Sequence, residues 1–166
     1  MANGTAPHAN PPSRWSETEH MQWKTSLPGK GYSSTIVWGD QALVSMAIST
    51  GPKKAPVYNQ AEGAHDNLAV DQDHAFVLAS YNRQTGNLAW KTILATVFPH
   101  EGGHDTGSLA SASPLTDGQH VIAFLARRVS AAWIFKARCS GRETLGEWIP
   151  GMRMVRGPHR PCTDLI

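Results

Sequence analysis

The stretch Arg83-Gln84-Thr85-Gly86-Asn87-Leu88-Ala89-Trp90 decides the fold of this chain. A polar turn around Thr85-Gly86 leads into a β-rich run, Leu88–Val97, and a second β-rich run, His74–Tyr81, precedes the turn. Glycine admits the positive φ that a tight connection between strands needs. The sequence therefore predicts an antiparallel hairpin with residues 82–87 as its turn.

A second hairpin is expected upstream of this one. Ser33–Val37 and Ala42–Ala47 are β-rich, and Trp38-Gly39-Asp40-Gln41 separates them. Glycine and aspartate in so short a connection are typical of a hairpin turn. Residues 50–72, which lie between the two hairpins, are polar and interrupted by glycine and proline, and this pattern predicts a long surface loop.

A repeat connects these elements. Trp23-Lys24-Thr25 recurs as Trp90-Lys91-Thr92, and the Ser-rich pattern of residues 33–44 returns at residues 111–122. One unit then contains a tryptophan-ended strand, a Ser-rich strand, an apolar strand and one further strand. Four antiparallel strands per unit are typical of a propeller blade, so the sequence predicts an all-β fold with a partial β-propeller of about one and a half blades.

The combination of motifs resembles the bacterial PQQ-like (pyrrolo-quinoline quinone) β-propeller repeat proteins. The resemblance covers residues 10–124 and rests on residues 83–90 and 113–118, together with Trp15-Ser16-Glu17, Trp23-Lys24 and residues 28–34. It implies a structural blade motif made of Trp23, Gly39, Asp40, Thr85, Gly86, Trp90, Pro114, Asp117 and Gly118. In such a motif the tryptophan rings are expected to fill the wedge between adjacent blades. No set of quinone ligands can be carried over to this sequence, so no cofactor and no catalytic residue are expected in this fragment.

Composition divides the chain into three segments. Residues 1–14 form an irregular leader with little apolar content, residues 15–124 form the blades, and residues 125–166 form a tail that is expected to be irregular, disordered or poorly structured. Residues 1–124 carry a net charge of −3, whereas the tail carries +5 and holds both cysteines, Cys139 and Cys162. Two cysteines in one such segment do not establish a disulfide framework.

The tail also breaks the repeat, and the genetic code offers a reason. When the codons possible after Phe124 are read from their third base, they permit Asp-Phe-Gln-Gly-Glu-Val-Leu-Trp, which mirrors residues 83–90. A one-base deletion in a run of six thymines would produce Phe124-Leu125-Ala126 from Phe-Phe-Gly. We therefore hypothesise a frameshift there, in which case Arg127, Arg128, Trp133, Cys139 and Cys162 have no role. The alternative is a genuine basic tail or a divergent segment of the repeat.

Charge and hydropathy exclude several classes of function. The chain has 166 residues, about one domain's worth, and its formal net charge is +2, too little for a dedicated nucleic-acid binder. No apolar run is long enough to form a transmembrane segment, and the N-terminus lacks the features of a signal peptide. The chain as written is therefore expected to be cytoplasmic, whereas the resemblance implies a periplasmic or secreted parent protein with its start upstream of Met1.

One stretch, His100-Glu101-Gly102-Gly103-His104, matches the zinc-protease pattern H-E-x-x-H. That pattern binds zinc only on a helix, where the two histidines lie one turn apart. Pro99 and the two glycines oppose a helix, so the sequence predicts a loop. Weaker candidates for a metal contact in that loop are His100, His104 and Asp105.

Other polar residues are interpreted as structural. The cluster of His65, Asp66, Asp71, Asp73 and His74 has no ligand spacing and is expected to be a solvated loop. Ser33, Ser34, Ser111 and Ser113 lack a paired base and are expected to form hydrogen bonds at strand starts. No phosphate-binding or kinase motif occurs in the sequence.

These observations favour a non-enzymatic repeat fragment. Its parent is expected to be a protein-binding or assembly scaffold whose partners are another protein or the remaining propeller blades. The fragment itself would have no function of its own if the frameshift is real. Two alternatives stay open: a fragment of a quinoprotein dehydrogenase, which would need PQQ with Ca²⁺, and an H-E-x-x-H metalloprotease.

Overall fold

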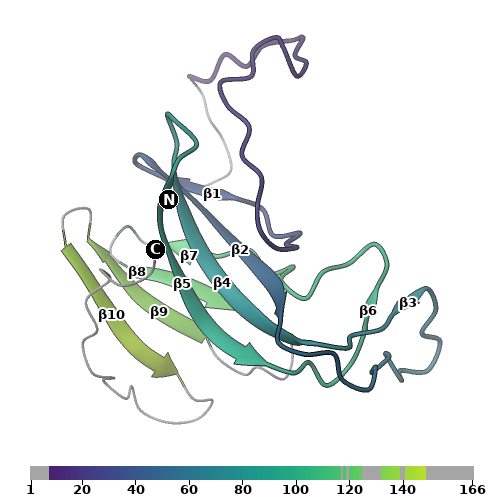
Figure 1. The fold of residues 1–166 in the computed structure, drawn as a ribbon. Coiled ribbons are helices and arrows are strands. Elements are labelled where there is room, and N and C mark those ends of the chain that lie inside the picture. Colours follow the sequence, from purple (N-terminus) through teal and green to yellow (C-terminus); the bar gives the residue numbers. More distant parts are fainter. Residues whose placement is uncertain (1–7, 117, 119, 125–131, 139–140, 149–166) are drawn as a thin grey trace.

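The computed structural model describes residues 8–116, 118, 120–124, 132–138 and 141–148, and all regular elements in these ranges are β-strands (Figure 1). The strands are β1 (Ile36–Trp38), β2 (Gln41–Thr50), β3 (Asn67–Leu68), β4 (Asp73–Asn82), β5 (Leu88–Val97), β6 (Gly103–His104), β7 (Leu115–Thr116), β8 (His120–Phe124), β9 (Ala132–Arg138) and β10 (Gly141–Trp148). The expected all-β class is confirmed. Within the described ranges there is no helix of the length and hydropathy needed to cross a bilayer.

The first sheet is a four-stranded antiparallel meander in the order β1-β2-β4-β5. Its two long central strands pair over their full length, from Gln41↔Asn82 to Thr50↔Asp73. Both hairpins that the sequence predicts are confirmed, β1 with β2 and β4 with β5. The loop of residues 51–72 is longer than an ordinary connection and contains β3 and a single bridge between Val57 and Val70.

The second sheet has the order β10-β9-β8-β7 and is also an antiparallel meander. It packs against one face of the first sheet. Leu43, Phe76 and Leu78 of the first sheet share a core cluster with Val121 and Ala123 of β8, and these two residues are completely buried. Burial of each large apolar side chain contributes about 1.5–3 kcal/mol, so this shared cluster stabilises the packing of the two sheets.

The opposite face of the first sheet forms a second cluster that includes Val44, Met46, Val77 and Tyr81. The chain before β1 runs along the same sheet and exchanges two backbone hydrogen bonds with β2: the N–H of Lys30 donates to the carbonyl of Ala47 (3.0 Å), and the N–H of Ala47 donates back (2.8 Å). The irregular segment before β1 is therefore part of the folded unit.

Two tryptophans pack onto turn glycines. A Cβ built on Gly86 would lie 2.6 Å from Cδ2 and Cε3 of Trp23, and a Cβ on Gly118 would overlap the Trp38 ring. Both glycines have positive φ, +73° and +88°. In addition, the indole N–H of Trp23 donates to the carbonyl of Arg83 (2.7 Å). Only glycine allows the rings to approach the turns so closely.

The other residues of the expected blade motif have structural contacts. Pro114 is fully buried, and the indole N–H of Trp90 donates to Oε1 of Gln41 (3.2 Å). The carbonyl of Asp40 accepts a hydrogen bond from the N–H of Arg83 (2.8 Å), which links the two hairpin turns of the first sheet. Gly39 has a φ of +56° in the first turn, and the N–H of Thr85 donates to Asn82 Oδ1 (3.0 Å) in the second. Asp117 lies outside the described residues.

Residues 132–138 and 141–148 differ from the irregular tail that the sequence predicts. Their backbone forms β9 and β10, and β9 pairs with β8 from His120↔Lys136 to Phe124↔Ala132. Trp133-Ile134-Phe135 is a run of β-branched and aromatic residues, which favour strands whatever reading frame produced them. The rest of residues 125–166 lies outside the described residues, and the frameshift hypothesis stays a prediction. The leader is described only from His8 and has no strand up to residue 14.

Candidate functional site

The candidate site lies where two long loops meet. β3 belongs to the loop between β2 and β4, and β6 belongs to the connection between the two large sheets. The two short strands pair as Asn67↔His104 and Leu68↔Gly103. In Figure 1 they project beyond the end of the first sheet at which β2 ends and β4 begins. This pairing brings together polar residues that are far apart in the sequence.

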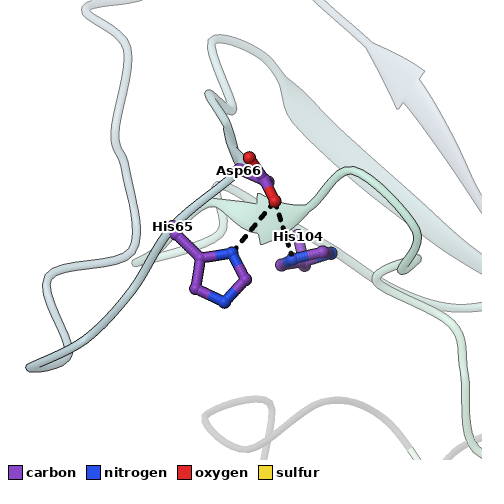
Figure 2. A group of neighbouring side chains, drawn as sticks. All are labelled: His65, Asp66 and His104. Atoms are coloured by element: carbon purple, nitrogen blue, oxygen red, sulfur yellow. Dashed lines mark hydrogen bonds and ion pairs between the residues drawn. The ribbon is translucent and has the colours of Figure 1, made fainter.

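Three side chains converge beside this short sheet (Figure 2). Nδ1 of His65 lies 3.0 Å from Oδ2 of Asp66, and Nε2 of His104 lies 3.8 Å from the same oxygen. The two imidazole rings meet edge to face, with centroids 5.2 Å apart. The three ligand atoms all lie within 4.8 Å of one another. Among the described residues, this trio is the group that could hold a metal ion.

Backbone contacts hold the trio in place. The N–H of Asp105 donates to the carbonyl of Asp66 (3.0 Å), which extends the pairing of β3 with β6. Asp66 has a φ of +48°, which aspartate tolerates better than most residues. Gly102 packs so closely that a Cβ there would overlap the carbonyl oxygen of Leu68. The loops are therefore joined by main-chain contacts and not by the three side chains alone.

Of the three residues that the sequence suggests as metal contacts, the structure places two at the trio and one away from it. His104 belongs to the trio, and Asp105 supports it, because Oδ1 of Asp105 lies 2.9 Å from Nδ1 of His104. His100 belongs elsewhere: its Nε2 lies 3.3 Å from Oε1 of Glu101. Residues 100–104 form a bend followed by β6, so the helix that a zinc protease needs is not formed, as the sequence predicts.

The polar residues around Asp66 were expected to form a solvated loop, and most of them have ordinary partners. Nζ of Lys53 lies 3.0 Å from Asp71, and Nζ of Lys54 lies 2.6 Å from Asp73. His74 contacts Oγ of Ser49 at 3.1 Å. His65 and Asp66 differ from these residues, because they face His104. No sequence spacing could have revealed this grouping, since it depends on the pairing of two strands of only two residues each.

The four serines form structural hydrogen bonds. The hydroxyl of Ser33 donates to the carbonyl of Ser45 (3.2 Å), and the N–H of Ser34 donates to Oγ of Ser113 (2.8 Å). Ser111 donates to the carbonyl of Ser108 (2.7 Å). None of these contacts pairs a serine with a base that could activate it.

A cavity of about 380 Å³ lies between the chain before β1 and the outer face of the first sheet. Its wall includes Thr25, Met46, Val77, Tyr81 and Lys91. Burial raises the pKa of the Tyr81 phenol above its ordinary value. The wall is mostly apolar and contains no pair of groups suited to acid and base catalysis, so the trio remains the candidate site.

The chain was also compared with known proteins. No family model, no curated protein and no solved structure matches it.

Proposed function

We propose that this chain is a segment of a non-enzymatic β-propeller repeat protein of the PQQ-like kind, and that the parent protein is a protein-binding or assembly scaffold. The observation that carries the proposal is that two tryptophans, at different positions of the repeating unit, each pack on a turn glycine. Trp23 packs on Gly86 and Trp38 packs on Gly118, and in both pairs the ring comes from an earlier segment of the chain than the turn it covers.

The arrangement of the sheets supports the same proposal. Each large sheet is a four-stranded antiparallel meander, and the two pack face to face through Leu43, Phe76 and Val121. Units that bury their apolar faces against their neighbours are typical of repeat proteins. The Trp38 contact joins the β1–β2 turn of one unit to the β7–β8 turn of the next, as expected for consecutive copies of one design.

Exposed apolar side chains on the last strand of the first sheet indicate where another unit would attach. Leu88 and Ile93 of β5 are 48% and 52% exposed, and among the described strands β5 is the last of its sheet, with β4 as its neighbour. A strand edge with apolar side chains is prone to pair with or pack against another chain. We therefore assign β5 as a contact surface for a further four-stranded unit, here a second copy of this chain.

The experiment measures the mass of the full chain by light scattering over a range of concentrations. We expect assemblies above the 18.0 kDa of one chain. Ile93→Lys should shift them toward monomer, because a charge on β5 opposes strand pairing. Leu68→Lys is the matched control: Leu68 is 44% exposed but lies on β3, so assembly should persist. A monomeric wild-type chain would contradict the assembly surface.

A second measurement tests the enzymatic alternative. The chain is incubated with PQQ and Ca²⁺, desalted, and examined for quinone absorbance and for oxidation of alcohols with an artificial electron acceptor. We expect neither retained quinone nor turnover. Stoichiometric uptake of the quinone would replace the scaffold proposal with a dehydrogenase.

A further inference from the structure

We propose that His65, Asp66 and His104 form a binding site for a divalent transition-metal ion of the zinc type, built jointly by the two loops that β3 and β6 join. The site is independent of the scaffold proposal, because it rests on the geometry of three side chains and not on the assembly of repeats.

The spacing of the ligand atoms fits one ion. Zinc bonds to imidazole nitrogen and carboxylate oxygen are about 2.0–2.2 Å long, so two ligands of a tetrahedral ion lie about 3.3 Å apart. The two distances from Asp66 Oδ2, 3.0 Å to His65 Nδ1 and 3.8 Å to His104 Nε2, lie on either side of that value. All three ligand atoms lie within 4.8 Å of one another, and rotation of these exposed side chains would bring them to the tetrahedral spacing.

The chemistry of the ligands selects the class of ion. Two imidazole nitrogens and one carboxylate suit zinc and its neighbours among the divalent transition metals, whereas Ca²⁺ and Mg²⁺ prefer sites made of oxygen alone. Oδ2 of Asp66 faces both rings, and in Figure 2 the dashed lines from the two rings meet at this oxygen. An ion there would bind to all three side chains at once.

A carboxylate behind His104 prepares this ring for coordination. Nδ1 of His104 lies 2.9 Å from both Oδ1 of Asp105 and Oγ1 of Thr106, and it also accepts a hydrogen bond from the N–H of Thr106 (3.3 Å). These contacts engage Nδ1 on the side of the ring away from the trio, whereas Nε2 faces Asp66. Histidines that bind metals through Nε2 commonly donate the N–H at Nδ1 to a nearby carboxylate, which increases ligand basicity, and Asp105 is a carboxylate at that distance. Asp105 therefore acts as a positioning residue.

The site leaves room for an exchangeable ligand. The side chains of His65, Asp66 and His104 are 75%, 63% and 41% exposed. Three protein ligands with open access leave a fourth position for water or for a group from outside the chain. A bound ion would also connect the loop before β4 to the connection that enters the second sheet, and so hold the two sheets in one arrangement.

The test titrates the full chain with Zn²⁺ by calorimetry and with Co²⁺ by visible absorption. We expect one equivalent of either ion. His65→Ala and His104→Ala should each weaken binding by at least about tenfold, and Asp105→Asn by about tenfold with the stoichiometry kept. His100→Ala is the matched control, because His100 lies in the same loop but outside the trio. The affinity of this variant for Zn²⁺ should equal that of the wild type. Circular dichroism of each variant verifies the fold.

Histidine footprinting on the wild-type chain gives an answer that does not depend on any variant. Carbethoxylation should be suppressed by Zn²⁺ at His65 and His104 and unchanged at His74. The proposal is overturned if neither ion binds, if the His65 and His104 variants bind as tightly as the wild type, if His100→Ala abolishes binding, or if Zn²⁺ protects neither His65 nor His104.

Discussion

The ring of Trp23 covers Gly86 so closely that a single added methyl group at this glycine would come within 2.6 Å of two ring carbons. The contact joins residues 63 positions apart, and the hydrogen bond from the Trp23 indole to the Arg83 carbonyl fixes the orientation of the ring. It attaches the irregular segment before β1 to the turn between β4 and β5. The stability of the first sheet therefore depends on a residue outside its strands.

Gly86→Ala should destabilise the chain by about 2–3 kcal/mol, because the methyl group both meets the Trp23 ring and adds strain at positive φ. The measurement is urea unfolding followed by tryptophan fluorescence. Gly63→Ala is the control: Gly63 has a φ of +78° but no atom within 4 Å, so it should lose only about 1 kcal/mol. Equal losses at the two positions would show that the contact with Trp23 contributes nothing.

Leu78→Ala should cost about 2–5 kcal/mol, since Leu78 is completely buried between the two large sheets. Leu68→Ala removes the same atoms from a side chain that is 44% exposed, and its loss should be within about 0.5 kcal/mol. Both values come from urea unfolding at constant pH. A small loss for Leu78→Ala would mean that the two sheets do not share one core.

Tyr81 should make stability fall in alkaline solution. Burial raises its pKa above the ordinary 10.0, so the unfolded chain ionises first and is favoured as the pH rises. The stabilisation is complete below pH 10 and is lost as the pH passes through the raised value. Unfolding midpoints are compared for the wild type and Tyr81→Phe from about pH 9 to 11, and the wild type should lose stability relative to the variant as the pH rises, because its phenol ionises more readily in the unfolded chain. Parallel curves would contradict this effect.

The frameshift hypothesis is tested on the DNA. Sequencing across the codons of Ala123 to Arg128 and onward should reveal a sixth thymine, or an alternate frame that continues into further tryptophan-ended strands. Confirmation of five thymines with no repeats downstream would instead establish the basic tail as genuine. The eight basic residues of residues 125–166 would then need a partner.

The elements that the sequence predicted correctly are those encoded by neighbouring residues. Gly39-Asp40 and Thr85-Gly86 lie at short connections between β-rich runs, so the hairpins β1–β2 and β4–β5 could be predicted with their turns. The packing role of Trp23 was also expected, but its partner was not, because contacts over 63 residues leave no local signal. The predicted propeller is neither closed nor tested by the two described sheets.

The candidate site was the least predictable feature. Two of its members, His65 and Asp66, were expected to be ordinary loop residues, and the third, His104, was grouped with His100. Strands of two residues carry no periodicity, so β3 and β6 could not be recognised before their pairing was known. Long loops with charged residues look alike in sequence whether or not a second loop lies against them.

The docking of Trp23 on Gly86 also has a consequence during protein synthesis. The ribosome synthesises Trp23 first, and Gly86, in the turn that Trp23 covers, follows 63 residues later. At elongation rates of about 5–20 residues per second this interval is about 3 to 13 seconds, far longer than hairpin formation. During that time the Trp23 ring has no turn to cover, so the nascent chain presents an unprotected indole that chaperones can bind before the fold is complete.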